Sequence, residues 1–178
     1  DTTLLKSFIN TQLGQPWEQD RKTIEPEDLY KRRETFDQVP EWVQLLYGFA
    51  DTQEDRIELT VLGVAEVDGH RRHVVLRHAM LLGDPRDGDV FDQLDAERQT
   101  KYVHGGTGGV MRLVAIGIDS GGTRTQEVYH YARTRRNVFC TKGQGGEGVP
   151  ATRAPSKVKT KSGHVVVLYS LGVDALKS

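Results

Sequence analysis

Three aspartates follow apolar runs of similar composition, and they are the residues of this sequence best suited to do chemistry. They are Asp51 in GFAD, Asp119 in GIDS and Asp174 in GVDA. When helices flank a sheet, side chains just beyond the strand ends meet in one crevice. Three carboxylates there would repel one another and lose their charge unless a cation neutralised them. Such hard oxygen ligands favour Mg²⁺ or Mn²⁺, and two of these ions can activate water and stabilise the leaving oxygen in phosphodiester hydrolysis.

Each aspartate taken alone also has an ordinary structural explanation. An aspartate after a strand is often a turn residue or the N-cap of a helix. The repetition after three apolar runs favours a shared metal site, but the pattern by itself leaves both interpretations open.

Other reactive residue types show weaker patterns. The six histidines have no HExxH or Cys/His spacing, and the chain contains neither a Walker A loop nor a GxSxG elbow. Glu127 follows Asp119 on a predicted helix and could reach the same site. Lys142 stands beside a flexible loop and could meet a phosphate. For Glu127 a solvated helix face is the favoured interpretation, and for Lys142 an ordinary exposed lysine is slightly favoured.

The charge distribution is uneven although the net charge is only −1, so no global basic field indicates nucleic acid. Residues 84–97 are acidic, whereas residues 133–136 and 153–161 are basic. Solvated surface is the simplest interpretation of each run, and a groove that follows DNA phosphates is the alternative. The candidate DNA-binding residues are Arg124, Lys142, Lys157, Lys159 and Lys161.

Strand and helix signals indicate an α/β domain. Strands are predicted at residues 43–50, 57–67, 72–82, 111–118, 138–141 and 165–171, and helices at 91–101 and 126–135. Asp68-Gly69 predicts a tight hairpin turn. The apolar run at 111–118 suggests a central strand covered on both faces. Hairpins followed by strand–helix alternation predict a mixed central sheet flanked by helices, and residues 143–163 form a long predicted loop.

Residues 1–43 are polar and helix-prone, with too few apolar residues for a core of their own. We expect this segment to be an arm or connector, and residues 44–178 to be the folded domain. Because the sequence begins at Asp1 without methionine and stops where a helix begins, we expect a fragment of a longer protein.

The composition narrows the class of protein. With 37% hydrophobic and 28% charged residues, the chain has the balance of a globular domain. Its single cysteine, Cys140, excludes an internal disulfide framework and a Cys-rich zinc site, and it fits a reducing compartment. No apolar run approaches the roughly 20 residues of a membrane helix, and we expect no membrane partner.

Several segments, in this order, resemble the large terminase subunits of lambda-like phages. They are FINTQLGQPW (8–17), VP (39–40), LLYGFADTQEDRIE (45–58), GIDSGGTRTQEVY (117–129), FCTKG (139–143), PSK (155–157) and GVD (172–174). One departure is Ala50, where the family usually has a larger aliphatic residue.

The resemblance implies a ribonuclease-H-like nuclease domain that uses Mg²⁺ or Mn²⁺ to cut concatemeric double-stranded viral DNA. By motif, Asp51 on the first strand, Asp119 at the end of the fourth and Asp174 at the start of the terminal helix become the metal-binding acids. The family also implies an ATPase domain before residues 1–43, which would then connect the two domains. It implies a small terminase subunit as partner, contact with the portal and procapsid through the full-length protein, and action in the host cytoplasm.

Two rival functions come from other classes. GIDSGGTRT (117–125) is similar to the phosphate loop of actin-like, sugar-kinase-type nucleotide-binding modules, in which glycines let backbone amides approach phosphates. In those proteins the loop lies in the first hairpin and leads to another strand, whereas here it is predicted to follow three strands and lead into a helix. The other rival is a DNA-docking module without catalytic activity.

Overall fold

The chain divides into two units, Asp1–Thr35 and Phe36–Ser178. The computed structural model describes residues 4, 7, 8, 11, 12, 26–146 and 148–177. In the first unit, helix α2 covers Pro26–Lys31, and much of the expected connector lies outside the described residues. The second unit begins before residue 44, because Val39 and Val43 are buried together with Leu46.

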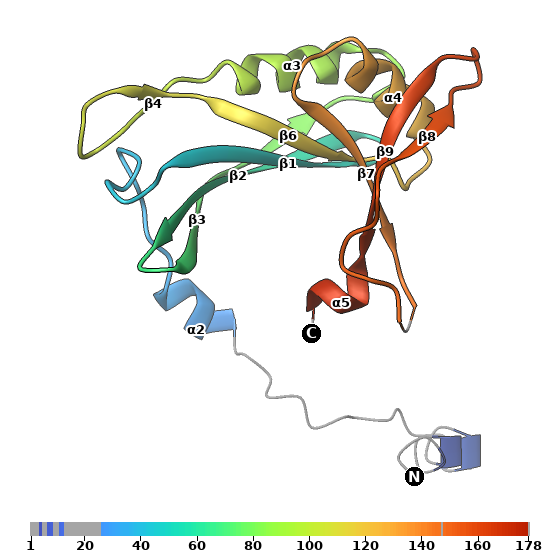
Figure 1. The fold of residues 1–178 in the computed structure, drawn as a ribbon, viewed down its shortest axis with the longest axis horizontal. Helices are drawn as coiled ribbons and strands as arrows, with labels where there is room; N and C mark the ends of the chain where they lie inside the picture. Colours follow the sequence, from blue (N-terminus) through green and yellow to red (C-terminus); the bar gives the residue numbers. More distant parts are fainter. Residues whose placement is uncertain (1–3, 5–6, 9–10, 13–25, 147, 178) are drawn as a thin grey trace. The chain divides into compact units, whose positions relative to one another are not determined.

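Seven strands of the second unit form one mixed sheet in the order β3-β2-β1-β6-β7-β9-β8 (Figure 1). They are β1 (Leu45–Thr52), β2 (Arg56–Val67), β3 (His70–Leu82), β6 (Leu113–Asp119), β7 (Val138–Gln144), β8 (Ser156–Lys159) and β9 (Val165–Gly172). Strands β1, β6, β7 and β9 are parallel. Strands β2, β3 and β8 each run antiparallel to the neighbour with which they form a hairpin or edge pair. Strands β4 (Tyr102–Val103) and β5 (Val110–Met111) form a separate ribbon.

The long β2–β3 hairpin turns where the sequence predicts. Asp68 and Gly69 both have positive φ angles, 52° and 75°, as a two-residue turn of this kind requires. Along β2, buried residues alternate with partly exposed ones. One face of the hairpin therefore joins the core and the other does not.

Helices α3 (Asp89–Arg98) and α4 (Thr125–Arg133) lie on the same side of the sheet (Figure 1). Helix α4 buries Val128, Tyr131 and Ala132 against the sheet. The rings of Phe91 on α3 and Tyr131 on α4 stack with centroids 4.6 Å apart. This arrangement confirms an α/β domain with a ribonuclease-H-like mixed sheet.

Two expectations about the sheet were wrong. Strand β6 is covered by α3 and α4 on one face only: Ile116 and Ile118 are buried there, while Ala115 and Gly117 are half-buried on the other face. Its apolar sequence reflects small residues on that second face rather than a second helical layer. The predicted loop at 143–163 contains strand β8, which pairs with β9 and packs Val158 against the core.

We call the face of the sheet opposite α3 and α4 the open face. Helix α5 (Val173–Lys177) directly follows β9. None of the helices in the described part of the chain is both long and apolar enough to cross a membrane.

Candidate functional site

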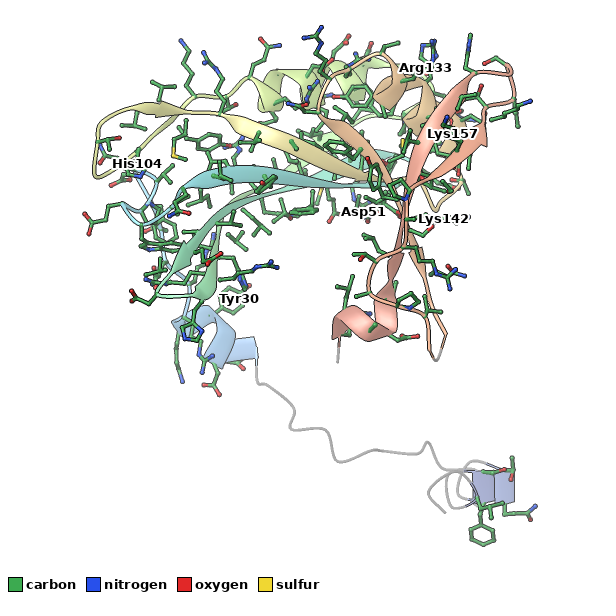
Figure 2. The ribbon with its side chains drawn as sticks, in the orientation of Figure 1. Tyr30, Asp51, His104, Arg133, Lys142 and Lys157 are labelled. Carbon is green, nitrogen blue, oxygen red and sulfur yellow. The ribbon has the colours of Figure 1, made fainter. Side chains whose placement is uncertain are left out.

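Asp51 and Asp119 lie at the C-terminal ends of neighbouring parallel strands. Ala50 on β1 pairs with Ile118 on β6, and both are buried on the helix-covered face. Because successive side chains of a strand point to opposite faces, the next residues, Asp51 and Asp119, turn to the open face. There they line one pocket of about 290 Å³, together with Phe49, Ala50, Glu58, Thr60, His78, Gly117 and Thr141. Figure 2 labels Asp51 where β1 ends.

Both aspartates are oriented by one hydrogen bond each. The side-chain amide of Gln53 donates to Asp51 Oδ2 at 3.3 Å, and the backbone N–H of Gly121 donates to Asp119 Oδ1 at 3.2 Å. A Cβ added at Gly121 would lie 3.3 Å from Asp119 Oδ1, so a side chain there would crowd the carboxylate. Each aspartate keeps one carboxylate oxygen that accepts no hydrogen bond within the described residues.

Glu58 is a third carboxylate of this pocket, and it was not identified from the sequence. It lies on β2 directly opposite Asp51. Its Oε1 accepts hydrogen bonds from Arg56 Nε at 2.8 Å and from the amide of Gln53 at 3.3 Å. In the sequence, Glu58 and Thr60 alternate with apolar residues, which indicates that they share one face of a strand. The sequence does not show which residues lie beside them on the neighbouring strand, because that depends on the strand pairing.

His78 on β3 completes the rim of the pocket. Its Nε2 lies 3.8 Å from Glu58 Oε2, and its Nδ1 shares a hydrogen bond of 3.1 Å with Thr60 Oγ1. A series of side-chain contacts therefore connects β3 with the end of β1, from His78 through Glu58 and Gln53 to Asp51. His78 pairs with Thr60 across the β2–β3 hairpin.

The structure places Asp174 outside this pocket. It lies on α5, where its Oδ2 accepts a hydrogen bond of 2.7 Å from the backbone N–H of Gly146. Gly172, the last residue of β9, pairs with Gln144, whereas Asp119 pairs with Thr141. Gln144 is thus on the order of 10 Å further along β7 than Thr141. The structure brings together Asp51 and Asp119 but not Asp174, whose place in the acid cluster stays a prediction.

The donor set fits a divalent cation. Asp51 and Asp119 offer hard carboxylate oxygens to one pocket, and Mg²⁺ is usually held by one or two carboxylates together with water and substrate phosphate. Across residues 26–146 and 148–177, no three His, Cys, Asp or Glu side chains are grouped so that they alone could hold a metal ion. A cation here would need water and substrate oxygens to complete its shell.

The candidate DNA-binding residues occupy different surroundings. Lys157 and Lys159 are exposed on the edge strand β8, and Lys142 is exposed on β7. The backbone N–H of Lys161 donates to Gln126 Oε1 at 2.7 Å, and its side chain is exposed. Figure 2 labels Lys142 and Lys157.

Arg124 is held within the protein. Its side chain is only 14% exposed, and its Nε lies 3.3 Å from Asp84 Oδ1. Hydrogen bonds from Arg86, followed by the charge of Arg124, lower the pKa of Asp84 to about 2. Glu127 lines a different depression, near Asp87 and on the helix-covered side of the sheet.

The loop at 117–125 does not have the setting of an actin-like phosphate loop. It leads from β6 into α4, as predicted, rather than into another strand. Its hydroxyl groups are used internally: Ser120 Oγ donates to the carbonyl of Thr141 at 2.8 Å, and Thr125 Oγ1 lies 2.8 Å from the carbonyl oxygens of Ser120 and Gly122. The nucleotide-binding alternative has no support here.

The chain is similar to known proteins along nearly its whole length. Residues 1–178 match the family described as terminase large subunit gpA, endonuclease domain. The large terminase subunit of Enterobacteria phage P21 is 28% identical over 181 residues, and that of Escherichia phage lambda is 29% identical over 181 residues. Each alignment covers 99% of this chain and 27% of the relative, so the chain spans about a quarter of the length of the curated relatives it matches. No solved structure matches. The chain therefore belongs to the endonuclease-domain family of terminase large subunits.

Proposed function

We propose that this chain is the metal-dependent endonuclease of a viral DNA-packaging motor and that it cuts concatemeric double-stranded DNA by hydrolysing phosphodiesters. The observation that carries the proposal is the shared pocket of Asp51 and Asp119 on the open face. Membership of the terminase endonuclease family supports the reaction class. An open face leaves room for a polymer, which a closed pocket would exclude.

Asp51 and Asp119 would hold Mg²⁺ or Mn²⁺, and two ions suit this chemistry. When bound, such ions supply positive charge to the phosphate and make water more acidic. Gln53 and Gly121 hold the two carboxylates in place before the cation arrives. His78 lines the rim of the pocket, where Thr60 and Glu58 face its two ring nitrogens.

Asp174 is proposed as the third acid. Strands β1, β6, β7 and β9 are parallel, so their C-terminal ends share one edge of the sheet, and α5 starts at that edge. Asp174 would have to exchange its hydrogen bond with Gly146 for a cation. A single bond to a backbone N–H is a modest obstacle to this exchange.

The proposed DNA contacts are the exposed lysines Lys142, Lys157, Lys159 and Lys161. Arg124 would contribute only by exchanging Asp84 for a phosphate. The small terminase subunit, and the portal and procapsid through the rest of the full-length protein, are proposed partners. The host cytoplasm is the proposed place of action.

A plasmid-nicking assay tests the function. Supercoiled DNA is incubated with the chain and Mn²⁺ or Mg²⁺, with parallel samples in EDTA and a parallel assay of ATP turnover. Cleavage that requires the divalent ion supports the proposal. ATP turnover without cutting would favour the nucleotide-binding rival, and DNA binding without cutting would favour a docking module; either outcome overturns the nuclease proposal.

A further inference from the structure

Aromatic rings lie on the open face beside the two aspartates. Phe49 on β1 is 51% exposed and Phe139 on β7 is 39% exposed. Phe139 meets Tyr169 on β9 edge to face, with ring centroids 5.5 Å apart. Phe49 also lines the pocket that contains Asp51 and Asp119.

The strand register places Phe49 and Phe139 in one row across the sheet. Phe49 pairs with Gly117 on β6, and Gly117 pairs with Phe139 on β7. A Cβ added at Gly117 would lie 3.4 Å from the Phe49 ring. Because Gly117 has no side chain, the Phe49 ring can lie close to the backbone of β6, and no Cβ stands between Phe49 and Phe139 in this row.

Two lysines continue this face at the edge of the sheet. Lys157 pairs with Val167 and Lys159 pairs with Val165, while Val158 between them packs toward the core. Lys157 and Lys159 are therefore turned to the open face. Neither lysine forms an ion pair with a carboxylate in the described part of the chain. From β1 to β8 the row spans four strand spacings, about 19 Å.

These features together specify the partner. A purely apolar partner would bury Phe49 and Phe139 but would gain nothing from unpaired lysines. An intact duplex would reach the lysines with its phosphates, but its bases are stacked inside and could not cover the rings. Unpaired bases stack on aromatic side chains, and the same strand carries phosphates that attract lysines.

We propose that the open face binds a locally unpaired DNA strand beside the acids. Its bases lie on the rings of Phe49 and Phe139, and its phosphates run toward Lys157 and Lys159. This inference rests on the proposed nuclease function and adds that the site takes a strand separated from its complement. Duplex DNA must then open where it is cut.

The test compares binding of a fluorescein-labelled single-stranded oligonucleotide and its blunt duplex, by anisotropy in EDTA, to the full chain and its variants. Phe49→Ala and Phe139→Ala are expected to weaken single-strand binding about fivefold or more and to change duplex binding little. Phe139→Trp should restore single-strand binding, whereas Phe139→Leu, which keeps apolar area without a ring, should not. Val75→Ala is the matched control, because Val75 is 53% exposed on β3 and has no ring.

Several outcomes would overturn the inference. They are single-strand binding that is unchanged in both alanine variants, equal loss of single-strand and duplex binding, or full rescue by leucine. Self-association of the wild-type chain that Phe49→Ala abolishes without affecting DNA binding would mean that the face binds a second copy instead. Metal-dependent plasmid cleavage by the wild type separates the two proposals. If cleavage occurs but the rings do not matter for binding, only the strand-binding inference fails; if there is no cleavage, the nuclease proposal itself fails.

Discussion

Asp51 and Glu58 lie directly opposite each other on β1 and β2, and the side-chain amide of Gln53 donates to both carboxylates at 3.3 Å. This amide sits between two negative charges that would otherwise repel each other. It leaves the second oxygen of Asp51 without a hydrogen bond from the described residues. Gln53 is thus a positioning residue for the candidate metal site.

Replacing Gln53 by alanine should weaken cation binding without removing any metal-binding acid. We expect the Mn²⁺ concentration for half-maximal cleavage to rise about tenfold, a typical effect of losing a residue that orients a metal ligand. The rate at saturating Mn²⁺ should stay close to that of the wild type. Gln44→Ala is the control, because Gln44 accepts a hydrogen bond from Glu66 far from the pocket. An unchanged Mn²⁺ requirement in Gln53→Ala would refute the positioning role.

Asp174→Asn tests whether the acid on α5 belongs to the site. If Asp174 exchanges Gly146 for a cation, the variant should lose most of its Mn²⁺-dependent cleavage while keeping its circular dichroism spectrum. The expected loss follows from the removal of one metal-neutralising charge. Full cleavage by this variant would leave Asp51 and Asp119, with water and substrate oxygens, as the whole ligand set.

The lysines of β8 should set the salt dependence of DNA binding. Each phosphate contact contributes about 0.7 to 0.9 to the slope of log affinity against log salt concentration. Lys157→Ala/Lys159→Ala should therefore make this slope less steep by roughly 1 to 2. The control Lys31→Ala/Lys101→Ala removes the same number of lysines from elsewhere and should leave the slope unchanged. Equal slopes for both double variants would exclude β8 from the DNA contact.

Asp95 stabilises the helical layer, and its contribution should depend on pH. Burial alone would raise the pKa of Asp95, but hydrogen bonds from Arg135, Tyr131 and Arg98 outweigh it and hold the pKa below its ordinary value. A lowered pKa means that the stabilisation is present above about pH 4, the range of an unfolded aspartate, and is lost as the pH falls below it.

Urea denaturation measures this contribution. At pH 7, Asp95→Asn should lower the free energy of unfolding by about 1–3 kcal/mol, the cost of weakening charged hydrogen bonds. The difference from the wild type should shrink at pH 3. Asp55→Asn, at a side chain that is 74% exposed, should change stability by less than about 0.5 kcal/mol. A pH-independent difference for Asp95→Asn would contradict the assignment.

The sequence was most informative where a local pattern decides the structure. Asp68-Gly69 specifies its turn, and the spacing of Val128, Tyr131 and Ala132 specifies the inner face of α4. Asp51 and Asp119 were predicted because each follows an apolar run that becomes a neighbouring parallel strand. Their presence in one pocket agrees with that expectation.

Features that depend on pairing between distant segments could not be predicted. Glu58 reaches the pocket only because β2 pairs with β1 in a register that sets it opposite Asp51. Strand β8 is short and exists through its pairing with β9. The open face was not predicted, because Ala115 and Gly117 make the sequence of β6 apolar although no helical layer covers that face.

The most direct test of the nuclease site is Mn²⁺-dependent nicking of supercoiled plasmid by Asp51→Asn and Asp119→Asn, each checked for an intact fold by circular dichroism. Asp68→Asn, in the distant hairpin turn, is the matched control and should cut like the wild type. Both site variants should lose cleavage, because each lacks one of the two charges that hold the cation in the shared pocket. Wild-type cleavage by either folded variant would show that the shared pocket is not where DNA is cut.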